Sequence, residues 1–237
     1  MVINILTKEQ LAKTIDFTLL SPTATYKNAQ GLCLAAKKYH FATVVINPCY
    51  ISICKKMLKD SDVKICSVVA YPLGAATVES KVFESKDCIK KGADELDIVV
   101  NLGMLKSGNF EYIEKEIQII VNVIRREQMA EYNKHINIKI VIENGSLTKD
   151  EVIKISKIIE ESGVDFIKTS SGFGVRGVEL DDVRLIREVV TRDIGVKASG
   201  GIKTFKDAQA LIDAGATRLG TSSGISIMDE YSEIFDK

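Results

Sequence analysis

The chain has 237 residues and a formal net charge of +0, because 32 lysines and arginines balance 32 aspartates and glutamates. This balance removes the main electrostatic reason to expect nucleic acid or an acidic membrane surface as a partner. With 46% hydrophobic and 27% charged residues, the composition is that of a folded globular protein and argues against intrinsic disorder.

Short runs rich in valine and isoleucine alternate along the chain with longer amphipathic runs. Most of the short runs are bounded by Gly, Asp or Asn, which is typical of strands in a sheet. The first strand is expected within KTIDFTLL, residues 13–20. Seven more are expected at Ala42–Asn47, Val63–Ala70, Asp94–Asn101, Ile138–Asn144, Val164–Ser170, Ile194–Gly200 and Ala216–Ser222.

Helical patterns separate these strands. In residues 110–128 isoleucines recur at three- and four-residue spacing, which predicts an amphipathic helix. Thr148 stands three residues before Glu151, as in a capping box that starts a helix. The clearest patterns cover 78–91, 110–128, 148–161 and 204–213.

The order of these elements predicts the fold class. Alternating strands and helices predict a parallel sheet covered by helices. About eight strand–helix units in a chain of this length fit a closed (β/α)8 barrel better than an open sheet. We therefore expect an α/β protein, a single (β/α)8 (TIM) barrel domain over residues 1–237 with a short N-terminal helix.

Charged residues stand near the carboxyl ends of three expected strands, where such barrels carry their function. Side chains alternate in and out along a strand. Asp97, Lys168 and Lys197 are therefore expected to point into the barrel, while their apolar neighbours face the helices. Burying an unpaired lysine is costly, so these three charged groups are the candidate catalytic residues.

Two inward-facing lysines have a specific chemical use. Each ammonium raises the cost of protonating the other, and burial adds to this effect, so Lys168 or Lys197 is expected to have a lowered pKa. A lysine that is neutral near pH 7 can attack a carbonyl carbon and form a Schiff base. The alternative is a structural Asp–Lys ion pair with one snorkelling lysine, because ion-pair networks also perturb pKa values.

Small residues follow the last two expected strands and precede helices. Gly200 and Gly201 follow the seventh strand, and Ser222 and Ser223 follow the eighth. In these barrels the two corresponding loops commonly bind phosphate through backbone N–H groups at a helix N-terminus. The alternative is that the glycines only allow tight turns.

A glycine-rich run, Gly172 to Gly177, matches the GxGxxG pattern of dinucleotide-binding proteins. It comes late in the chain, and the next strand ends without an acidic residue for a ribose, so the context of that fingerprint is missing. We interpret the run as a flexible loop after the sixth strand. Arg176 within it is a candidate contact for an anionic substrate.

The remaining features concern compartment and cofactors. No apolar stretch is long enough to span a membrane, and the N-terminal sequence MVINILTKEQ lacks the pattern of a signal peptide. The five cysteines include no CxxC motif, which favours free thiols in a reducing cytoplasm. His40 and His135 are the only histidines, and their spacing argues against a His-based metal site or a Ser-His-Asp triad.

Five segments together resemble the 2-deoxyribose-5-phosphate aldolase family: IDFTLLSPTAT, VVAYPLGAATVESKVFE, GADELDIVVNLGMLKSGNF, DFIKTSSGFG and GVKASGGIKTFKDAQALIDAGATRLGTSSG. The resemblance extends from about Leu11 to Ile227, and its most specific parts surround Lys168 and Lys197. It implies a (β/α)8 barrel and a class I aldolase without a metal or other cofactor. The implied reaction is the reversible cleavage of 2-deoxy-D-ribose 5-phosphate to D-glyceraldehyde 3-phosphate and acetaldehyde.

The resemblance also implies roles for individual residues. Lys168 would be the Schiff-base lysine, Lys197 would lower its pKa and relay protons, and Asp97 would act as general acid and base with a water. The implied phosphate ligands are Gly172, Gly200, Gly201, Ser222 and Ser223. Because family members are usually dimeric or larger, a homodimer or homotetramer is expected.

Three departures from the family pattern stand out. Phe17 replaces a common histidine, and Asn144 replaces a usual threonine. After GFG the family usually continues with two glycines and then Ala-Thr, where this chain has Val175-Arg176-Gly177-Val178-Glu179. The last change lies near the expected phosphate end, so an aldolase of the same mechanism acting on a different phosphorylated sugar is an alternative. A phosphosugar-binding barrel without catalysis is a further alternative, disfavoured because a binding protein needs no lysine pair.

Overall fold

Eight parallel strands form a closed barrel in the computed structural model, which describes residues 6–129 and 134–236. Each strand pairs with the next one in the chain, and β8 pairs with β1 to close the ring. The strands are β1 Ile15–Leu19, β2 Thr43–Ile46, β3 Lys64–Val69, β4 Glu95–Val99, β5 Asn137–Val141, β6 Phe166–Lys168, β7 Gly195–Ser199 and β8 Arg218–Thr221. The predicted (β/α)8 fold is confirmed.

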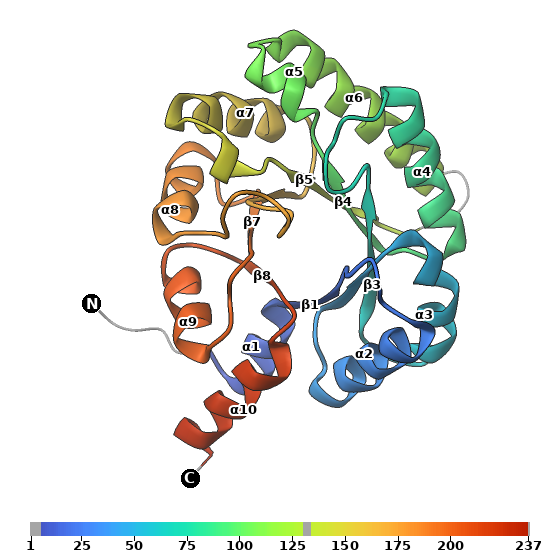
Figure 1. Ribbon diagram of the computed structural model, residues 1–237, viewed down its shortest axis with the longest axis vertical. Helices are drawn as coiled ribbons and strands as arrows, with labels where there is room; N and C mark the ends of the chain where they lie inside the picture. The colour runs from blue at the N-terminus through green and yellow to red at the C-terminus, as the bar shows by residue number, and fades with distance from the viewer. Residues whose placement is uncertain (1–5, 130–133, 237) are drawn as a thin grey trace.

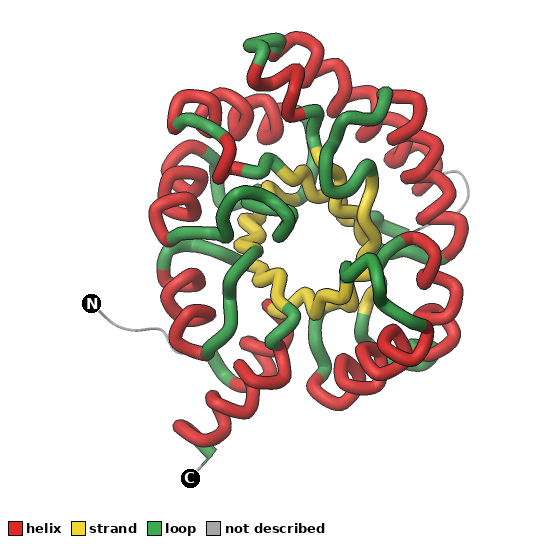
Figure 2. The backbone as a smooth tube through the Cα atoms, in the orientation of Figure 1, coloured by secondary structure: helices red, strands yellow, loops and turns green. Residues whose placement is uncertain are grey.

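Helices surround the ring of strands on its outside (Figures 1 and 2). The α-helices are α1 Lys8–Thr14, α2 Tyr26–Tyr39, α3 Ile51–Met57, α4 Val78–Lys91, α5 Leu102–Lys106, α6 Phe110–Glu127, α7 Lys149–Glu161, α8 Leu180–Val189, α9 Phe205–Asp213 and α10 Gly224–Phe235. Two short 3-10 helices, η1 Pro48–Tyr50 and η3 Asn144–Ser146, follow β2 and β5. No helix among these residues is long and apolar enough to cross a membrane.

The helix boundaries follow capping signals in the sequence. Thr148 is the N-cap of α7, and its side chain accepts a hydrogen bond from the backbone N–H of Glu151 in a capping box, as predicted. Thr204 caps α9 in the same way. The predicted first strand is present, although its first two residues, Lys13 and Thr14, end α1 instead.

The apolar core lies between the strands and the helices. Outward-facing strand residues such as Leu96, Ile167, Val196 and Ala198 are fully buried in one continuous apolar cluster with the inner faces of the helices. Their neighbours along each strand therefore point into the barrel, where charged groups collect. Strand alternation thus separates an apolar shell from a polar interior.

The register between strands sets which interior residues lie side by side. Lys168 of β6 pairs with Lys197 of β7, and Asp97 of β4 pairs with Lys139 of β5. Residues at the same level of a barrel point toward a shared interior. The register therefore brings one carboxylate within reach of several lysines.

The expected domain boundaries, 1–237, include residues 1–5, 130–133 and 237, which lie outside the described part of the chain. Within the described part, α1 lies beside α10 (Figure 1). The hydroxyl of Tyr231 in α10 donates a hydrogen bond to the carbonyl oxygen of Leu6. This contact joins the segment before α1 to the last helix.

Candidate active site

Asp97 lies between the two predicted lysines inside the barrel. Its Oδ2 atom accepts hydrogen bonds from Lys168 Nζ at 2.8 Å and from Lys197 Nζ at 2.7 Å. Asp97 and Lys197 are fully buried, and Lys168 is 2% exposed at the carboxyl end of β6. The structure therefore brings together the three residues that the sequence selected for chemistry.

Asp97, Lys168 and Lys197 belong to a wider network of ion pairs inside the barrel. Lys139 Nζ lies 2.5 Å from Glu95 and 3.2 Å from Asp97, and Lys197 Nζ lies 2.5 Å from Asp16. The guanidinium of Arg218 contacts Asp16 at 2.7 Å and Glu95 at 3.4 Å. In these connected ion pairs four cationic side chains face three carboxylates, so the cations exceed the carboxylates by one. The four cations are Lys139, Lys168, Lys197 and Arg218.

The pKa of Lys168 is raised, contrary to the sequence prediction. Burial alone would lower this pKa, but the Asp97 carboxylate and the Tyr71 hydroxyl outweigh burial. Burial would likewise raise the pKa of Asp97, yet Lys139, Lys168 and Lys197 hold it well below its usual range. The lowered pKa was expected from the repulsion between two lysines, whereas the alternative, an Asp–Lys ion pair, describes the contact that the structure shows, because the Asp97 carboxylate lies between the two ammonium groups.

Tyr71 and Cys66 also contact the trio, although sequence reasoning did not select them. Lys168 Nζ donates a hydrogen bond to the Tyr71 hydroxyl at 3.2 Å. The Cys66 thiol donates to Asp97 Oδ1 at 3.2 Å, and burial raises its pKa. A buried neutral thiol is a weak donor, so it completes the surroundings of Asp97 without adding charge.

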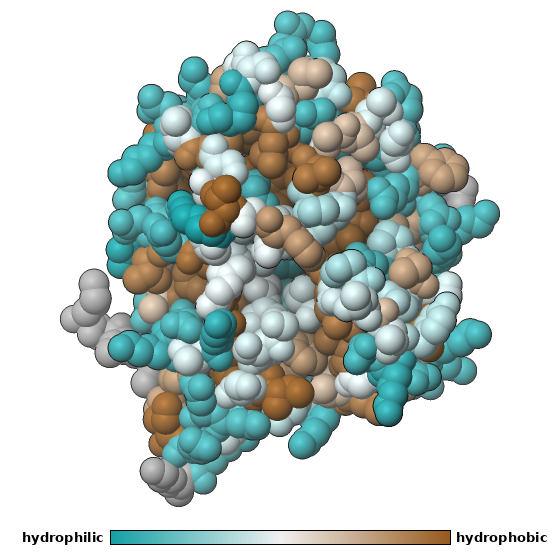
Figure 3. Space-filling view, in the orientation of Figure 1, coloured by the Kyte–Doolittle hydropathy of each residue, from teal (hydrophilic) through white to brown (hydrophobic). Residues whose placement is uncertain are grey.

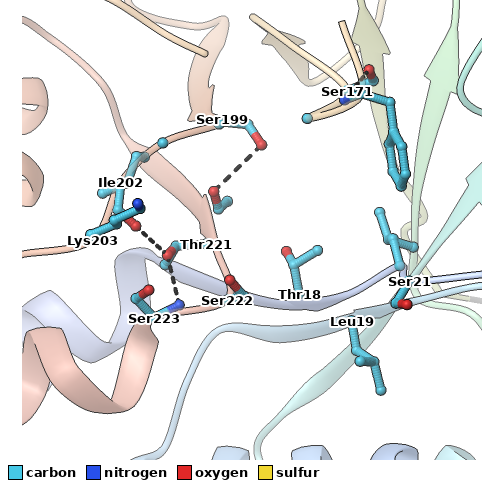
Figure 4. A pocket seen from close by; sticks show the side chains of 16 residues that line it. Thr18, Leu19, Ser21, Ser171, Ser199, Ile202, Lys203, Thr221, Ser222 and Ser223 are labelled. Atoms are coloured by element: carbon cyan, nitrogen blue, oxygen red, sulfur yellow. Dashed lines mark hydrogen bonds between the residues drawn. The ribbon is translucent and has the colours of Figure 1, made fainter. Parts of the chain in front are cut away.

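The five predicted phosphate ligands line one pocket at the mouth of the barrel. Its volume is about 370 Å³, and the space-filling view shows a hollow near the middle of this face (Figure 3). Ser171 lies across it from Ser222 and Ser223, and Thr18 lies beside Ser222 (Figure 4). The predicted ligands in its wall are Gly172, Gly200, Gly201, Ser222 and Ser223.

The wall of this pocket is suited to an anion. Ser223 is the N-cap of α10, and its side chain makes no capping hydrogen bond, which leaves the first N–H groups of this 12-residue helix for another acceptor. Lys203, which the sequence analysis did not select, adds an exposed ammonium to the same wall (Figure 4). Positive charge and free N–H groups both favour an anionic ligand.

The glycine-rich loop after β6 leans over the ring of strands (Figures 1 and 2). A Cβ atom on Gly177 would lie 2.5 Å from the carbonyl oxygen of Gly200, and Val178 N–H donates to that same oxygen. A Cβ on Gly174 would lie 2.2 Å from the Glu143 carboxylate. Gly174 and Gly177 therefore permit close packing between loops, and Gly172 has a positive φ of 90°, so each glycine of the pattern has a structural role that needs no nucleotide.

Arg176 does not line the mouth pocket, contrary to the role suggested for it as an anion contact. Its guanidinium forms two hydrogen bonds with the Asp182 carboxylate, at 2.6 and 2.8 Å, and one with the carbonyl of Gly177. Asp182 lies in α8, and Glu179 is the N-cap of this helix. The departure from the family pattern in this loop therefore fixes the start of α8.

Two charged interior residues that the sequence analysis did not select, Lys139 and Arg218, follow the same alternation along a strand that pointed to Asp97, Lys168 and Lys197. Ile138 and Ile140 face the helices, so Lys139 between them faces inward, and Arg218 precedes the outward-facing Leu219. Alternation could have found both. Tyr71 follows the end of β3 in an irregular turn, where no periodicity applies.

The chain is similar in sequence and structure to known aldolases. Residues 9–229 match the family described as DeoC/LacD family aldolase. The deoxyribose-phosphate aldolase of a Thermoanaerobacter species is 46% identical over 224 residues, which cover 94% of this chain and 98% of that protein. The enzyme of the same name from Clostridium perfringens is 45% identical over 222 residues, which cover 94% and 96%. The tetrameric deoxyribose phosphate aldolase from Aeropyrum pernix superposes with a TM-score of 0.86 at 30% identity, covering 96% of this chain and 93% of that one.

Proposed function

Because the chain belongs to the DeoC/LacD family of aldolases, we propose that it is a Schiff-base aldolase of 2-deoxy-D-ribose 5-phosphate. The enzyme cleaves this sugar reversibly to D-glyceraldehyde 3-phosphate and acetaldehyde. The observation that carries the proposal is the contact of Lys168 and Lys197 with one carboxylate oxygen of Asp97. A phosphosugar binder without catalysis would have no use for such an arrangement.

In the cleavage direction Lys168 is the nucleophile. The lone pair of its Nζ forms a bond to C1 of the open-chain sugar, and the π electrons of the carbonyl move to oxygen. The nitrogen gives up one proton and the oxygen takes up two, the second from a general acid, so that water leaves and an iminium ion remains. This ion is the electron sink for the next step.

Carbon–carbon cleavage then needs two proton transfers, one from the C3 hydroxyl oxygen and one to C2. A base takes the proton of the C3 hydroxyl, the C2–C3 bond breaks, and its electron pair moves toward the iminium nitrogen to give an enamine. D-Glyceraldehyde 3-phosphate leaves. A proton added to C2 and water added to C1 then release acetaldehyde and the free amine. We assign these proton transfers to Asp97 and Lys197 together with a water.

The nucleophile must first lose a proton that Asp97 helps to hold. Two features favour Lys168 as the group that loses this proton. The network holds one cation more than it has carboxylates. Lys168 also lies at the mouth of the barrel, where its side chain keeps some exposure while those of Lys139 and Lys197 have none. Since its pKa is raised, the fraction of free amine grows with pH. We therefore expect imine formation to accelerate as the pH rises above neutrality.

The substrate phosphate occupies the mouth pocket in this proposal. Gly172, Gly200, Gly201, Ser222 and Ser223 contact it through N–H and hydroxyl groups, with Lys203 as counter-charge. The alternative of a different phosphorylated sugar rested on the loop that contains Arg176 and Glu179. The guanidinium of Arg176 is bound to Asp182, Glu179 is the N-cap of α8, and neither residue lines the mouth pocket. Nothing in the pocket wall then favours another substrate over deoxyribose 5-phosphate.

We also expect a homodimer or homotetramer in the cytoplasm. The Aeropyrum pernix relative is described as tetrameric. On this chain Phe83 of α4 and Ile119 of α6 expose apolar side chains that line a common groove, which supports association. All five cysteines are free, which supports a reducing compartment.

Borohydride trapping tests the nucleophile and the reaction class together. Enzyme mixed with acetaldehyde and borohydride should gain a covalent two-carbon adduct on Lys168, because reduction converts the imine to a stable secondary amine. Peptide mass spectrometry locates the label. Lys168→Met should remain unlabelled and inactive, whereas Lys197→Leu should still be labelled, more slowly. Label on another residue, or no label on the wild-type protein, would overturn the proposal.

A further inference from the structure

Tyr71 lies next to the proposed nucleophile Lys168 and takes no part in the proton transfers assigned to Asp97 and Lys197. It follows β3 in a turn where Ala70 has a positive φ and Gly74 N–H donates to the Ala70 carbonyl. The side chain is half-buried. Its ring centroid lies 5.1 Å from Lys168 Nζ and 6.1 Å from the ring of Phe173, which it meets edge to face. Two contacts with neighbouring groups thus fix the ring.

The Tyr71 hydroxyl has two partners of different kinds. It accepts a hydrogen bond from Lys168 Nζ at 3.2 Å and donates one to the carbonyl oxygen of Ser171. The N–H of Ser171 in turn donates to Glu143 Oε2 at 2.9 Å. The phenol proton is therefore committed to Ser171, and the oxygen presents a lone pair to the lysine.

These partners determine the orientation of the Lys168 amine. Apart from its bond to Cε, Nζ has three tetrahedral positions. One N–H is directed to Asp97 Oδ2 and one to the Tyr71 oxygen, and no hydrogen-bond partner for the third position occurs in residues 6–129 and 134–236. When the ammonium loses a proton, the two held N–H groups leave the lone pair at that third position.

We propose that the Tyr71 hydroxyl is a catalytic residue that, together with Asp97, holds both N–H groups of the free Lys168 amine and so aims its lone pair at the substrate carbonyl. The inference rests on the proposed function, because it concerns the attack by Lys168. Holding a nucleophile in its reactive direction is a recognised source of rate enhancement. Tyr71 also joins the nucleophile to Ser171 in the wall of the mouth pocket.

The hydroxyl can keep this role across the working pH range because it stays protonated. Burial raises the pKa of Tyr71, and this effect outweighs the opposing influence of Lys168. The bond also favours the ammonium form of Lys168. Removing the hydroxyl should therefore have two separate consequences: a less well-directed amine, and an amine that loses its proton at lower pH.

The test is Tyr71→Phe, which keeps the ring and its contacts with Lys168 and Phe173. Tyr231→Phe is the matched control, because it removes a hydroxyl that also donates to a backbone carbonyl, that of Leu6, at the far end of the chain. Cleavage of deoxyribose 5-phosphate and the rate of borohydride trapping on Lys168 are each measured against pH.

For Tyr71→Phe we expect the plateau value of kcat to fall about tenfold, as for the loss of one hydrogen bond to a reacting group. KM should stay within about twofold, and the pH of half-maximal trapping should fall by about one unit. Tyr231→Phe should match the wild type. A purely structural role would reduce the folded fraction and leave the pH midpoint in place.

Tyr71→Phe with an unmoved midpoint and a kcat within twofold of the wild type would overturn the inference while leaving the proposed function intact. A wild-type protein that yields no adduct on Lys168 would overturn both. The two failures are therefore distinguishable in one set of measurements.

Discussion

Two buried lysines of this barrel form ion pairs of equal length and differ in almost everything else. Lys168 Nζ lies 2.8 Å from Asp97 inside the barrel, and Lys81 Nζ lies 2.8 Å from Glu116 between α4 and α6. The pKa of Lys168 is raised, whereas burial lowers the pKa of Lys81. Burial also raises the pKa of Glu116.

The difference arises from the surroundings of each pair. Lys81 and Glu116 satisfy each other, with the carbonyl of Val99 and the N–H of Asn101 as further partners, so the pair closes on itself between two helices. Lys168 belongs to a network with an excess cation and lies three residues before Ser171, which lines the mouth pocket. Access and unbalanced charge, rather than the length of the ion pair, distinguish the proposed nucleophile Lys168 from Lys81.

The strongest test of this contrast is Asp97→Asn. We expect kcat to fall by about 10²–10⁴-fold, because the amide cannot exchange protons as a general acid and base. Loss of the carboxylate also lowers the pKa of Lys168, so half-maximal borohydride trapping should move to lower pH. Turnover within a few-fold of the wild type, measured on protein shown by circular dichroism to be folded, would contradict the role of Asp97.

Lys81→Met should affect stability and spare catalysis. It leaves the Glu116 carboxylate buried without its cation, which should lower the free energy of unfolding by about 3–5 kcal/mol. Urea unfolding measures this loss, and kcat at a temperature where the variant is folded should stay within about twofold. Adding Glu116→Gln should restore most of the stability. If Lys81→Met alone were as stable as the wild type, Glu116 would not depend on Lys81 as its partner, which would contradict this interpretation of the pair.

A third lysine, Lys203 at the rim of the mouth pocket, extends the comparison to an exposed cation. Lys203→Ala should raise KM for deoxyribose 5-phosphate about tenfold, as expected for one lost charge-assisted contact, with kcat little changed. KM for unphosphorylated deoxyribose should not respond. Lys206→Ala is the control, because Lys206 is exposed on α9 outside this pocket. If Lys203→Ala and Lys206→Ala raised KM equally, the cause would be long-range electrostatic attraction of the substrate and not a direct contact of Lys203 with its phosphate.

The sequence alone determined the fold and the inward direction of the charged side chains. Eight short strand-like runs, most of them rich in valine and isoleucine, are separated by amphipathic segments and allow few other architectures. The period of two along a strand places Asp97, Lys168 and Lys197 on the interior face. Capping residues such as Thr148 marked helix starts. These signals are local, because each depends on residues within one turn or one strand.

Only the tertiary structure decided which groups meet inside the barrel. The raised pKa of Lys168 depends on a carboxylate 71 positions away, and the bond from Tyr71 to Ser171 joins residues 100 positions apart. The pKa of a buried group depends on charges from every strand that contributes to the barrel interior, so it cannot be predicted from the sequence of one segment.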